Sequence, residues 1–202
     1  MGAGEVLHRD RASRQPGSGP AVAVGYGTTE GQTARIAGLV GEVVAARGYR
    51  VWLDDLRAAG PDLLQGCAGV ILGASVHLGR HQRYVTDYVR RHREDLDRVP
   101  SAFFSVSLAA LGDRATAERY VAQLVQQTGW QPTTVGFFPG ALPYTRYGFV
   151  KKRVMRRIAR GKPGLLGTDL TRDYDYTDPD AVRRFVEDFL VERVSAAPRP
   201  PG

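Results

Sequence analysis

Short apolar runs alternate along the chain with longer segments whose apolar residues recur every three or four positions. The runs lie at 21–24, 69–73, 101–106 and 134–138, and a fifth segment, 49–53, alternates as a strand does. Such runs are typical of strands in a buried parallel sheet, and the wider spacing is typical of amphipathic helices. Five strands that alternate with helices predict an α/β fold with an open, doubly wound parallel sheet.

The helical segments carry residues that commonly begin and end helices. Four helices are expected, at about 32–47, 84–89, 113–128 and 179–193. Asp113 is a candidate N-cap of the third helix, and Thr177 or Asp178 a candidate N-cap of the last. Gly48 and Gly129 follow the expected C-termini of the first and third helices, where glycine is favoured.

The first strand leads into a polar loop of the kind that binds phosphate. Gly25-Tyr26-Gly27 is followed by Thr28, Thr29, Glu30, Gly31, Gln32 and Thr33. A strand–loop–helix turn directs backbone N–H groups and a helix N-terminus toward an anion. Thr28 and Thr33 add hydroxyl groups, and Gly27 and Gly31 would let the backbone approach a ligand closely. We interpret residues 27–33 as a phosphate-binding loop.

Other interpretations of this loop remain open at this point. A Walker loop needs a lysine after its last glycine, and here Gln32 follows Gly31. The dinucleotide fingerprint is half met, because Glu30 stands at its third glycine position, although Asp54 or Asp55 would supply its acidic residue. An ordinary strand–helix turn is the simplest alternative.

Two more loops are expected beside the first. Ligands of open parallel sheets bind beyond the carboxyl ends of the strands, where 27–33, 74–79 and 105–111 would emerge. All three loops consist mostly of small residues, which would allow a flat ring to lie against the backbone.

Length and composition predict one domain, at 21–194, preceded by a disordered extension at 1–20 and followed by a disordered tail at 195–202. The chain has 202 residues and is long enough for a full core. The single cysteine, Cys67, excludes an internal disulfide, is expected in core packing, and suits a reducing cytosol. No apolar run approaches the ~20 residues of a membrane span, and the first twenty residues do not resemble a signal peptide.

The positive charge of the chain is concentrated in one segment. Residues 146–162 contain eight basic and no acidic residues, so the remainder carries −1 of the total charge of +7. The basic residues are Arg146, Lys151, Lys152, Arg153, Arg156, Arg157, Arg160 and Lys162. At about 100° per residue, Tyr147, Val150, Val154, Met155 and Ile158 share one face of a helix, and most of the basic residues share the other.

A short basic amphipathic helix is typical of a segment that lies on an anionic membrane surface. Alternatively, its apolar stripe docks on the sheet and leaves a solvated basic face. Nucleic acid is not expected as a partner, because no nucleic-acid-binding signature accompanies the charge.

Several motifs in this order resemble one family. They are T-x-x-G-Q-T at 28–33, I-L-G-A-S-V-x-x-G at 71–79, P-S-A-F-F-S-V-S-L at 100–108, G-A-L-x-Y-x-x-Y at 140–147 and Y-T-D at 176–178. Together they resemble the flavodoxin-type, menaquinone-dependent protoporphyrinogen oxidases of bacterial haem synthesis. The resemblance implies a flavodoxin-like sheet of strand order 2-1-3-4-5 with helices on both faces, and one non-covalent FMN. It also implies electron transfer from protoporphyrinogen IX to a membrane quinone.

The resemblance assigns roles to the three loops. Residues 28–33 would bind the FMN phosphate, and two further sets would flank the ring: Ala74, Ser75, Val76, His77, Leu78 and Gly79, and Ser105, Val106, Ser107, Leu108 and Ala109. Leu78 and Val106 or Leu108 stand where many flavodoxins stack aromatic rings. His77 would lie near the N1–C2 edge of the flavin, or would be a solvated loop residue.

The basic segment would contact substrate or membrane. Tyr144 and Tyr147 would pack against a flat macrocycle, or would simply pack within their loop. Arg146 or Lys151 would pair with propionates, and Lys152, Arg153, Arg156 and Arg157 would face anionic lipid. The location implied is cytoplasmic, peripherally bound to the inner face of the cell membrane.

The flavin, and not an acid–base constellation, would then carry the chemistry. The four histidines, at 8, 77, 81 and 92, form no recognisable cluster, and no metal-ligand spacing is visible. Two alternatives remain: an electron-carrying flavodoxin, and a flavodoxin-like interaction module without FMN. Carriers are usually acidic, so the basic segment argues against the first.

Overall fold

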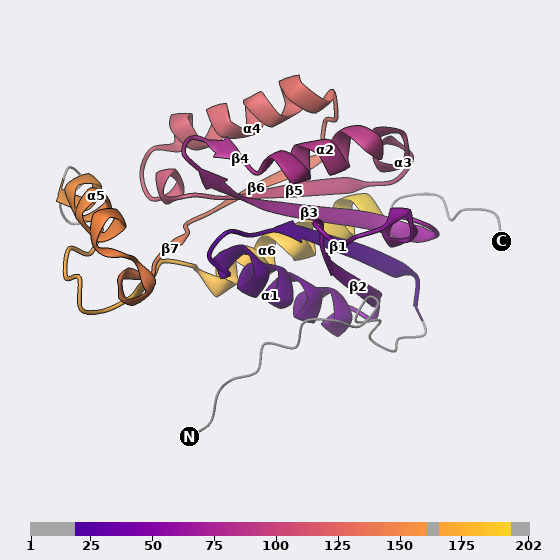
Figure 1. Ribbon diagram of the computed structural model, residues 1–202. Helices are drawn as coiled ribbons and strands as arrows, with labels where there is room; N and C mark the ends of the chain where they lie inside the picture. Colours follow the sequence, from indigo (N-terminus) through magenta and orange to yellow (C-terminus); the bar gives the residue numbers. More distant parts are fainter. Residues whose placement is uncertain (1–18, 161–165, 195–202) are drawn as a thin grey trace.

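The computed structural model describes residues 19–160 and 166–194 (Figure 1). The predicted extension at 1–20, apart from its last two residues, the tail at 195–202 and Lys162 lie outside the described residues. Within the basic helix, the side chains of Val150, Lys151, Val154, Ile158, Ala159 and Arg160 are likewise not described.

Five parallel strands form the central sheet. In spatial order they are β2 (Arg50–Asp55), β1 (Ala21–Gly27), β3 (Cys67–His77), β5 (Ser101–Val106) and β6 (Thr134–Phe138). If only these five strands are numbered along the chain, their spatial order is 2-1-3-4-5, which confirms the predicted order. The strands alternate their side chains between the two faces, so Val22 and Val24 pack on one side and Ala23 on the other.

Helices cover both faces of the sheet (Figure 1). On one face lie α1 (Gln32–Ala46) and α6 (Pro179–Phe189), which continues into a single π turn at Leu190–Val194. On the other lie α2 (Arg83–Arg91), α3 (Arg93–Asp97) and α4 (Arg114–Thr128). The first face is filled by a core that includes Phe104, Phe138 and Phe189, and the second by a core that includes Tyr88, Phe103 and Trp130.

The predicted helix caps are present. Asp113 Oδ1 accepts a hydrogen bond from the Thr116 N–H at 3.1 Å, and Asp178 Oδ1 accepts one from the Asp180 N–H at 2.9 Å. Gly129, with φ of 72°, ends α4 in the left-handed conformation that glycine adopts without strain.

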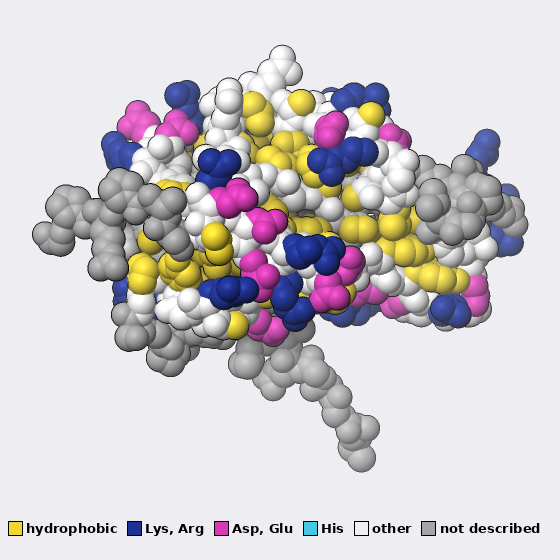
Figure 2. Space-filling view, turned by 180° about the vertical axis from the view of Figure 1, so that it is seen from behind, with side chains coloured by type: hydrophobic (Ala, Val, Ile, Leu, Met, Phe, Trp, Pro, Cys, Tyr) yellow, Lys and Arg dark blue, Asp and Glu magenta, His cyan; other side chains and the backbone are white. Residues whose placement is uncertain are grey.

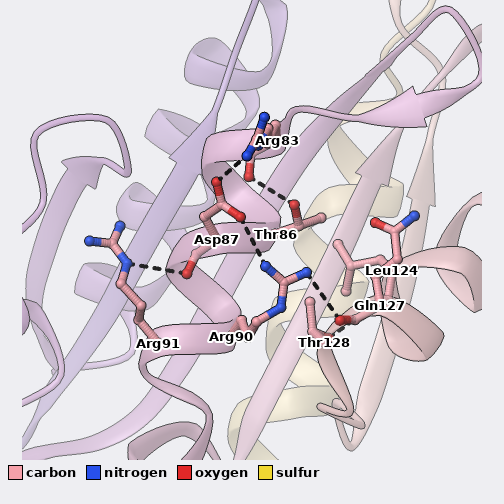
Figure 3. Close-up of polar contacts among 8 residues, drawn as sticks. All are labelled: Arg83, Thr86, Asp87, Arg90, Arg91, Leu124, Gln127 and Thr128. Carbon is pink, nitrogen blue, oxygen red and sulfur yellow. Dashed lines mark hydrogen bonds and ion pairs between the residues drawn. The ribbon is translucent and has the colours of Figure 1, made fainter.

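Polar contacts fasten α2 beside α4 (Figure 3). Arg90 Nη1 donates to Asp87 Oδ1 at 3.0 Å, and Arg90 Nη2 donates to the carbonyl oxygen of Gln127 at 3.2 Å. Each contact is exposed and contributes little to stability alone. The first contact lies within α2 and the second joins α2 to α4; the first residues of α2 lie next to the phosphate-binding loop.

Residues 74–79 were expected to form a loop, and this prediction was wrong, because they belong to a strand and the turn of a β-hairpin. The strand β3 continues through His77 and pairs with β4 (Arg80–His81), with Val76 opposite His81 and His77 opposite Arg80. The apolar run ends at Gly73, but Ala74 and Ser75 still pair in parallel with β5, and the next two residues pair with β4 because the chain folds back on itself.

A separate excursion follows β6. It contains β7 (Ala141–Leu142), α5 (Phe149–Arg160) and β8 (Tyr174–Asp175), with β7 and β8 antiparallel to each other. Three short 3₁₀ turns complete the described part of the fold, at Pro61–Leu63, Leu108–Ala110 and Tyr144–Arg146. The expected basic helix is present as α5, which stands away from the sheet (Figure 1).

Candidate functional site

The phosphate-binding loop is closed by one of its own hydroxyl groups. The Gly31 N–H donates to Thr28 Oγ1 at 2.9 Å, and Gly31, with φ of 90°, immediately precedes α1. No side chain caps this helix. The first N–H groups of a helix have no intrahelical partner, so those of α1 remain for an anion.

Three of the four buried side-chain polar atoms that lack a partner in the described residues lie at the predicted loops, and the fourth, Tyr88 OH, lies in α2. Among the described residues, four buried side-chain atoms lack a hydrogen bond: Thr33 Oγ1, Gln82 Oε1, Tyr88 OH and Ser107 Oγ. Thr33 belongs to the first loop and Ser107 to the third, and the Gln82 amide lies between the first loop and the second. Such atoms are rare in folded proteins, and a ligand is one explanation for them. The residues present therefore fit a polar ligand across these loops.

Two glycines of the first loop have different roles. A side chain at Gly31 would meet no atom within 4 Å, which leaves the space beside the loop open. A Cβ at Gly27 would lie 2.3 Å from Val85 and 3.2 Å from the Tyr84 hydroxyl. The absence of a side chain at Gly27 was expected to let the backbone approach a ligand. That expectation was wrong, because α2 occupies the space that a side chain would fill.

Residues that the sequence did not indicate support the loop from behind. The Thr28 N–H donates to the Tyr84 hydroxyl at 3.0 Å, and Arg57 Nη2 donates to the Thr28 carbonyl oxygen at 3.1 Å. The Arg57 guanidinium also lies 4.7 Å from the centre of the Tyr84 ring. These contacts fix both backbone groups of Thr28 and so the direction of the loop.

The second predicted ring-binding segment is the hairpin. Ala74 is buried, Ser75 and Val76 are half-buried, and His77 and Leu78 are exposed. Leu78 is 90% exposed and has a φ of 50°, which is uncommon for a residue other than glycine. The next residue, Gly79, has a φ of 79°. The turn thus presents an apolar side chain to the outside at the carboxyl end of the sheet.

The third predicted segment is largely buried. Ser105, Val106, Ser107 and Ala109 are buried, whereas Leu108 is half-buried. The Ser105 hydroxyl lies 3.0 Å from His81 Nε2, and His81 is itself only 8% exposed. Burial lowers the pKa of His81 from 6.5 to about 4, so its ring is neutral at neutral pH.

The excursion after β6 is attached to the phosphate-binding loop. The Tyr147 hydroxyl donates to Glu30 Oε2 at 2.7 Å. Gln32 Nε2 donates to Asp175 Oδ1 at 2.8 Å and to Thr177 Oγ1 at 2.7 Å. Burial, followed by the hydrogen bond with Glu30, raises the pKa of Tyr147, so its hydroxyl stays protonated as the donor.

Tyr144 and Tyr147 lie in a small core of their own, with Leu142 and Leu166. Tyr144 has no exposed surface, and its hydroxyl donates to the Gly167 carbonyl oxygen at 3.0 Å. This placement corresponds to loop packing, the second of the two roles expected for these tyrosines. The half-buried Met155 of α5 packs against the same core.

Most of the basic side chains described in the excursion are exposed. Arg146, Arg153, Arg156 and Arg157 are exposed and Lys152 is half-buried, while Phe149, at the start of α5, is 79% exposed. On the face seen in Figure 2, by contrast, basic and acidic side chains are interspersed. None of the described helices combines the length and apolarity needed to cross a bilayer. Within the described residues, no three His, Cys, Asp or Glu side chains group as metal ligands do.

Comparisons with known proteins agree with this geometry. The family model described as a flavodoxin domain matches residues 23–165. A protoporphyrinogen IX dehydrogenase [quinone] of Leishmania major is 35% identical over 87% of this chain and 77% of its own length. The Escherichia coli K12 protein of the same name is 25% identical over 81% of this chain and 91% of its own.

A solved short-chain flavodoxin, associated with a non-canonical PDU bacterial microcompartment, has the same fold. It superposes with a TM-score of 0.55 at 14% identity, covering 88% of this chain and 99% of its own. The family model and the Leishmania relative together identify the chain as a member of the flavodoxin-type protoporphyrinogen IX dehydrogenase family.

Proposed function

We propose that this protein is an FMN-dependent dehydrogenase that oxidises protoporphyrinogen IX to protoporphyrin IX in haem biosynthesis, with a membrane quinone as electron acceptor. The observation that carries the proposal is the 35% identity, over most of the chain, with an enzyme named for this substrate and acceptor class. As a flavodoxin domain, the chain binds FMN non-covalently.

The loop geometry supports the assignment of FMN to the carboxyl ends of the strands. The free N–H groups at the start of α1 and the unpartnered Thr33 hydroxyl suit a phosphate. Residues 74–79 and 105–109 would hold the ring, with Ser107 Oγ as an additional polar group. When bound, FMN supplies the hydride acceptor, and the chain's own residues bind it, orient it and exclude water.

The reaction balances without further reactants. Each two-electron step removes two hydrogens from the porphyrinogen and converts one quinone to its quinol. The described residues contain an exposed apolar side chain, Leu78, at the rim of the proposed ring site. A flat, largely apolar macrocycle is expected to contact such a side chain, and the exposed Arg146 would pair with a propionate.

The cofactor assignment is tested by the substitution Thr33→Val. The change keeps the shape of the side chain and removes the unpartnered hydroxyl. FMN affinity, measured by quenching of flavin fluorescence, should fall about three- to tenfold, while the urea midpoint stays the same or rises. Unchanged FMN affinity would remove Thr33 from the phosphate site.

The activity is tested anaerobically, with protoporphyrinogen and a soluble quinone analogue. Porphyrin fluorescence should rise faster than in a blank without protein, and omission of the quinone should stop the reaction after the bound flavin is reduced. If fluorescence matches the blank while the protein carries FMN, the electron-carrier alternative is favoured. If the protein quenches no FMN, the interaction-module alternative is favoured.

We also propose that α5 lies on an anionic membrane surface. The exposed Phe149 and the exposed basic residues of α5 provide the apolar and the charged contributions that such binding needs. Each basic residue near such a surface contributes ~1 kcal/mol, so replacing four of them should abolish binding at moderate salt. Binding of this kind would keep the enzyme at the cytoplasmic side of the membrane, next to its quinone.

Vesicle sedimentation tests this proposal. Anionic vesicles should bind the protein in a salt-dependent manner, and neutral vesicles should not. The test variant replaces four basic residues by Gln: Lys152, Arg153, Arg156 and Arg157. The control variant removes the same charge from other exposed positions: Arg80, Arg91, Arg119 and Arg183. Equal loss of binding in both variants would mean that net charge, and not α5, attracts the protein to lipid.

A further inference from the structure

The residue that joins the first two FMN loops is Gln82, which the sequence motifs do not include. Its Nε2 donates to Thr29 Oγ1 at 3.1 Å and also to Ser75 Oγ. Thr29 belongs to the phosphate-binding loop, and Ser75 belongs to the hairpin expected beside the ring. A single amide group therefore connects two loops that are 46 residues apart in the sequence.

Helix capping does not explain this glutamine. Gln82 occupies the N-cap position of α2, with an extended backbone, but its side chain makes no capping hydrogen bond. Ser, Thr, Asp and Asn are the residues favoured at that position. The amide instead turns toward the loops, and its Oε1 is buried without a hydrogen-bond partner. Because the Gln82 amide does not cap the helix, we expect its contribution to come from its hydrogen bonds to the two loops.

The direction of these hydrogen bonds decides what the two hydroxyls can do. A hydroxyl has one donor and two acceptor sites. Because Gln82 Nε2 donates to both oxygens, Thr29 and Ser75 each keep their own O–H free to donate. Phosphate oxygens accept hydrogen bonds and donate none, so a hydroxyl fixed as a donor is the complementary group.

We propose that Gln82 is a positioning residue for FMN, which fixes the spacing of the first two loops and sets the Thr29 and Ser75 hydroxyls as donors toward the cofactor. This inference rests on the proposed FMN-binding function. It predicts that a carboxylate at position 82 is harmful although it has the same shape. The carboxylate would accept from both hydroxyls, consume their donors and place a negative charge beside the phosphate.

The test compares Gln82→Glu, Gln82→Met and the control Gln126→Glu, which adds the same charge at an exposed position of α4. FMN and riboflavin, which lacks the phosphate, are each titrated at neutral pH by fluorescence quenching. Gln82→Met should weaken FMN binding about three- to tenfold, because the hydroxyls lose their orientation. Gln82→Glu should weaken it more than tenfold, and riboflavin binding much less.

The FMN-to-riboflavin ratio separates positioning from general damage. If Gln82 served the fold alone, both flavins would lose affinity equally, and that result would overturn the proposal. FMN binding by Gln82→Glu equal to that by Gln126→Glu would overturn it as well. Should Gln82→Glu not fold, judged by circular dichroism, Gln82→Met decides: unchanged FMN affinity overturns the proposal. Failure of the unaltered protein to bind FMN would instead reject the proposed function itself.

Discussion

Acid is expected to destabilise this protein through one buried imidazole, that of His81. The ring is 8% exposed, contacts the Ser105 hydroxyl and lies edge-on to Phe103 with ring centres 5.2 Å apart. Burial lowers its pKa from 6.5 to about 4, partly opposed by the backbone of Tyr120. Between these two values the unfolded chain binds a proton that the folded chain does not. The stability contributed by the neutral ring is therefore complete above pH 6.5 and is lost as the pH falls toward about 4.

The gap between the two pKa values corresponds to about 3 kcal/mol, since one pKa unit is worth about 1.4 kcal/mol. That is a large share of the roughly 5–15 kcal/mol that stabilises an ordinary domain. Carboxyl groups with lowered pKa values, such as those of Asp173 and Asp175, lose their contributions only as they protonate, below about 4. In the window from 6.5 to about 4 the loss caused by His81 is opposed by Asp54, whose pKa is raised by burial and by the neighbouring Asp55.

Urea unfolding at a series of pH values across this window provides the measurement. The free energy of unfolding should fall with pH in the unaltered protein and should fall much less in His81→Gln, whose amide can still reach Ser105. His77→Gln, at the exposed position of the hairpin, is the matched control and should keep the pH dependence of the unaltered protein. The same slope in His81→Gln and the unaltered protein would refute the argument.

Three further predictions concern contacts described above. Tyr147→Phe removes the hydrogen bond to Glu30 and should lower the free energy of unfolding by about 1–2 kcal/mol in urea titrations. An unchanged free energy would mean that this hydrogen bond does not stabilise the protein. Asp113→Ala removes the cap of α4 and should cost about 1 kcal/mol, seen as a lower Tm, whereas an equal Tm would argue against the cap. Burial raises the pKa of the Cys67 thiol to about 11, so a thiol reagent should modify Cys67 in urea and not in the folded protein; rapid labelling without urea would contradict its burial.

The sheet and its helices could be predicted because their signals are local. Apolar runs, helix periodicity and caps such as Asp113 depend on residues a few positions apart, and all of these were confirmed. The short strands β4, β7 and β8 contain two residues each and leave no periodicity. They form through pairing with distant or folded-back segments, which a single sequence does not reveal.

Of the candidate site, the positions of the loops could be predicted from the sequence, but the residues that support them could not. The three loops follow directly from the positions of the strand ends, and their small residues are visible in the sequence. The residues behind them were missed, since Tyr84 reaches Thr28 across 56 positions and Gln82 reaches Thr29 across 53. Tyr147 was expected either against a macrocycle or in loop packing, and neither expectation indicated its partner. Its bond to Glu30 depends on how the excursion packs.

The pairing of β7 with β8 has a consequence for how this family can vary. Ala141 lies opposite Asp175 and Leu142 opposite Tyr174, so the chain leaves and re-enters the domain at neighbouring points, about one inter-strand distance apart. Residues inserted or deleted between these two points need not shift the register of any strand in the main sheet. The excursion can therefore change in length or charge without disturbing the main sheet, provided that the contacts of Tyr147, Asp175 and Thr177 with the phosphate-binding loop are kept.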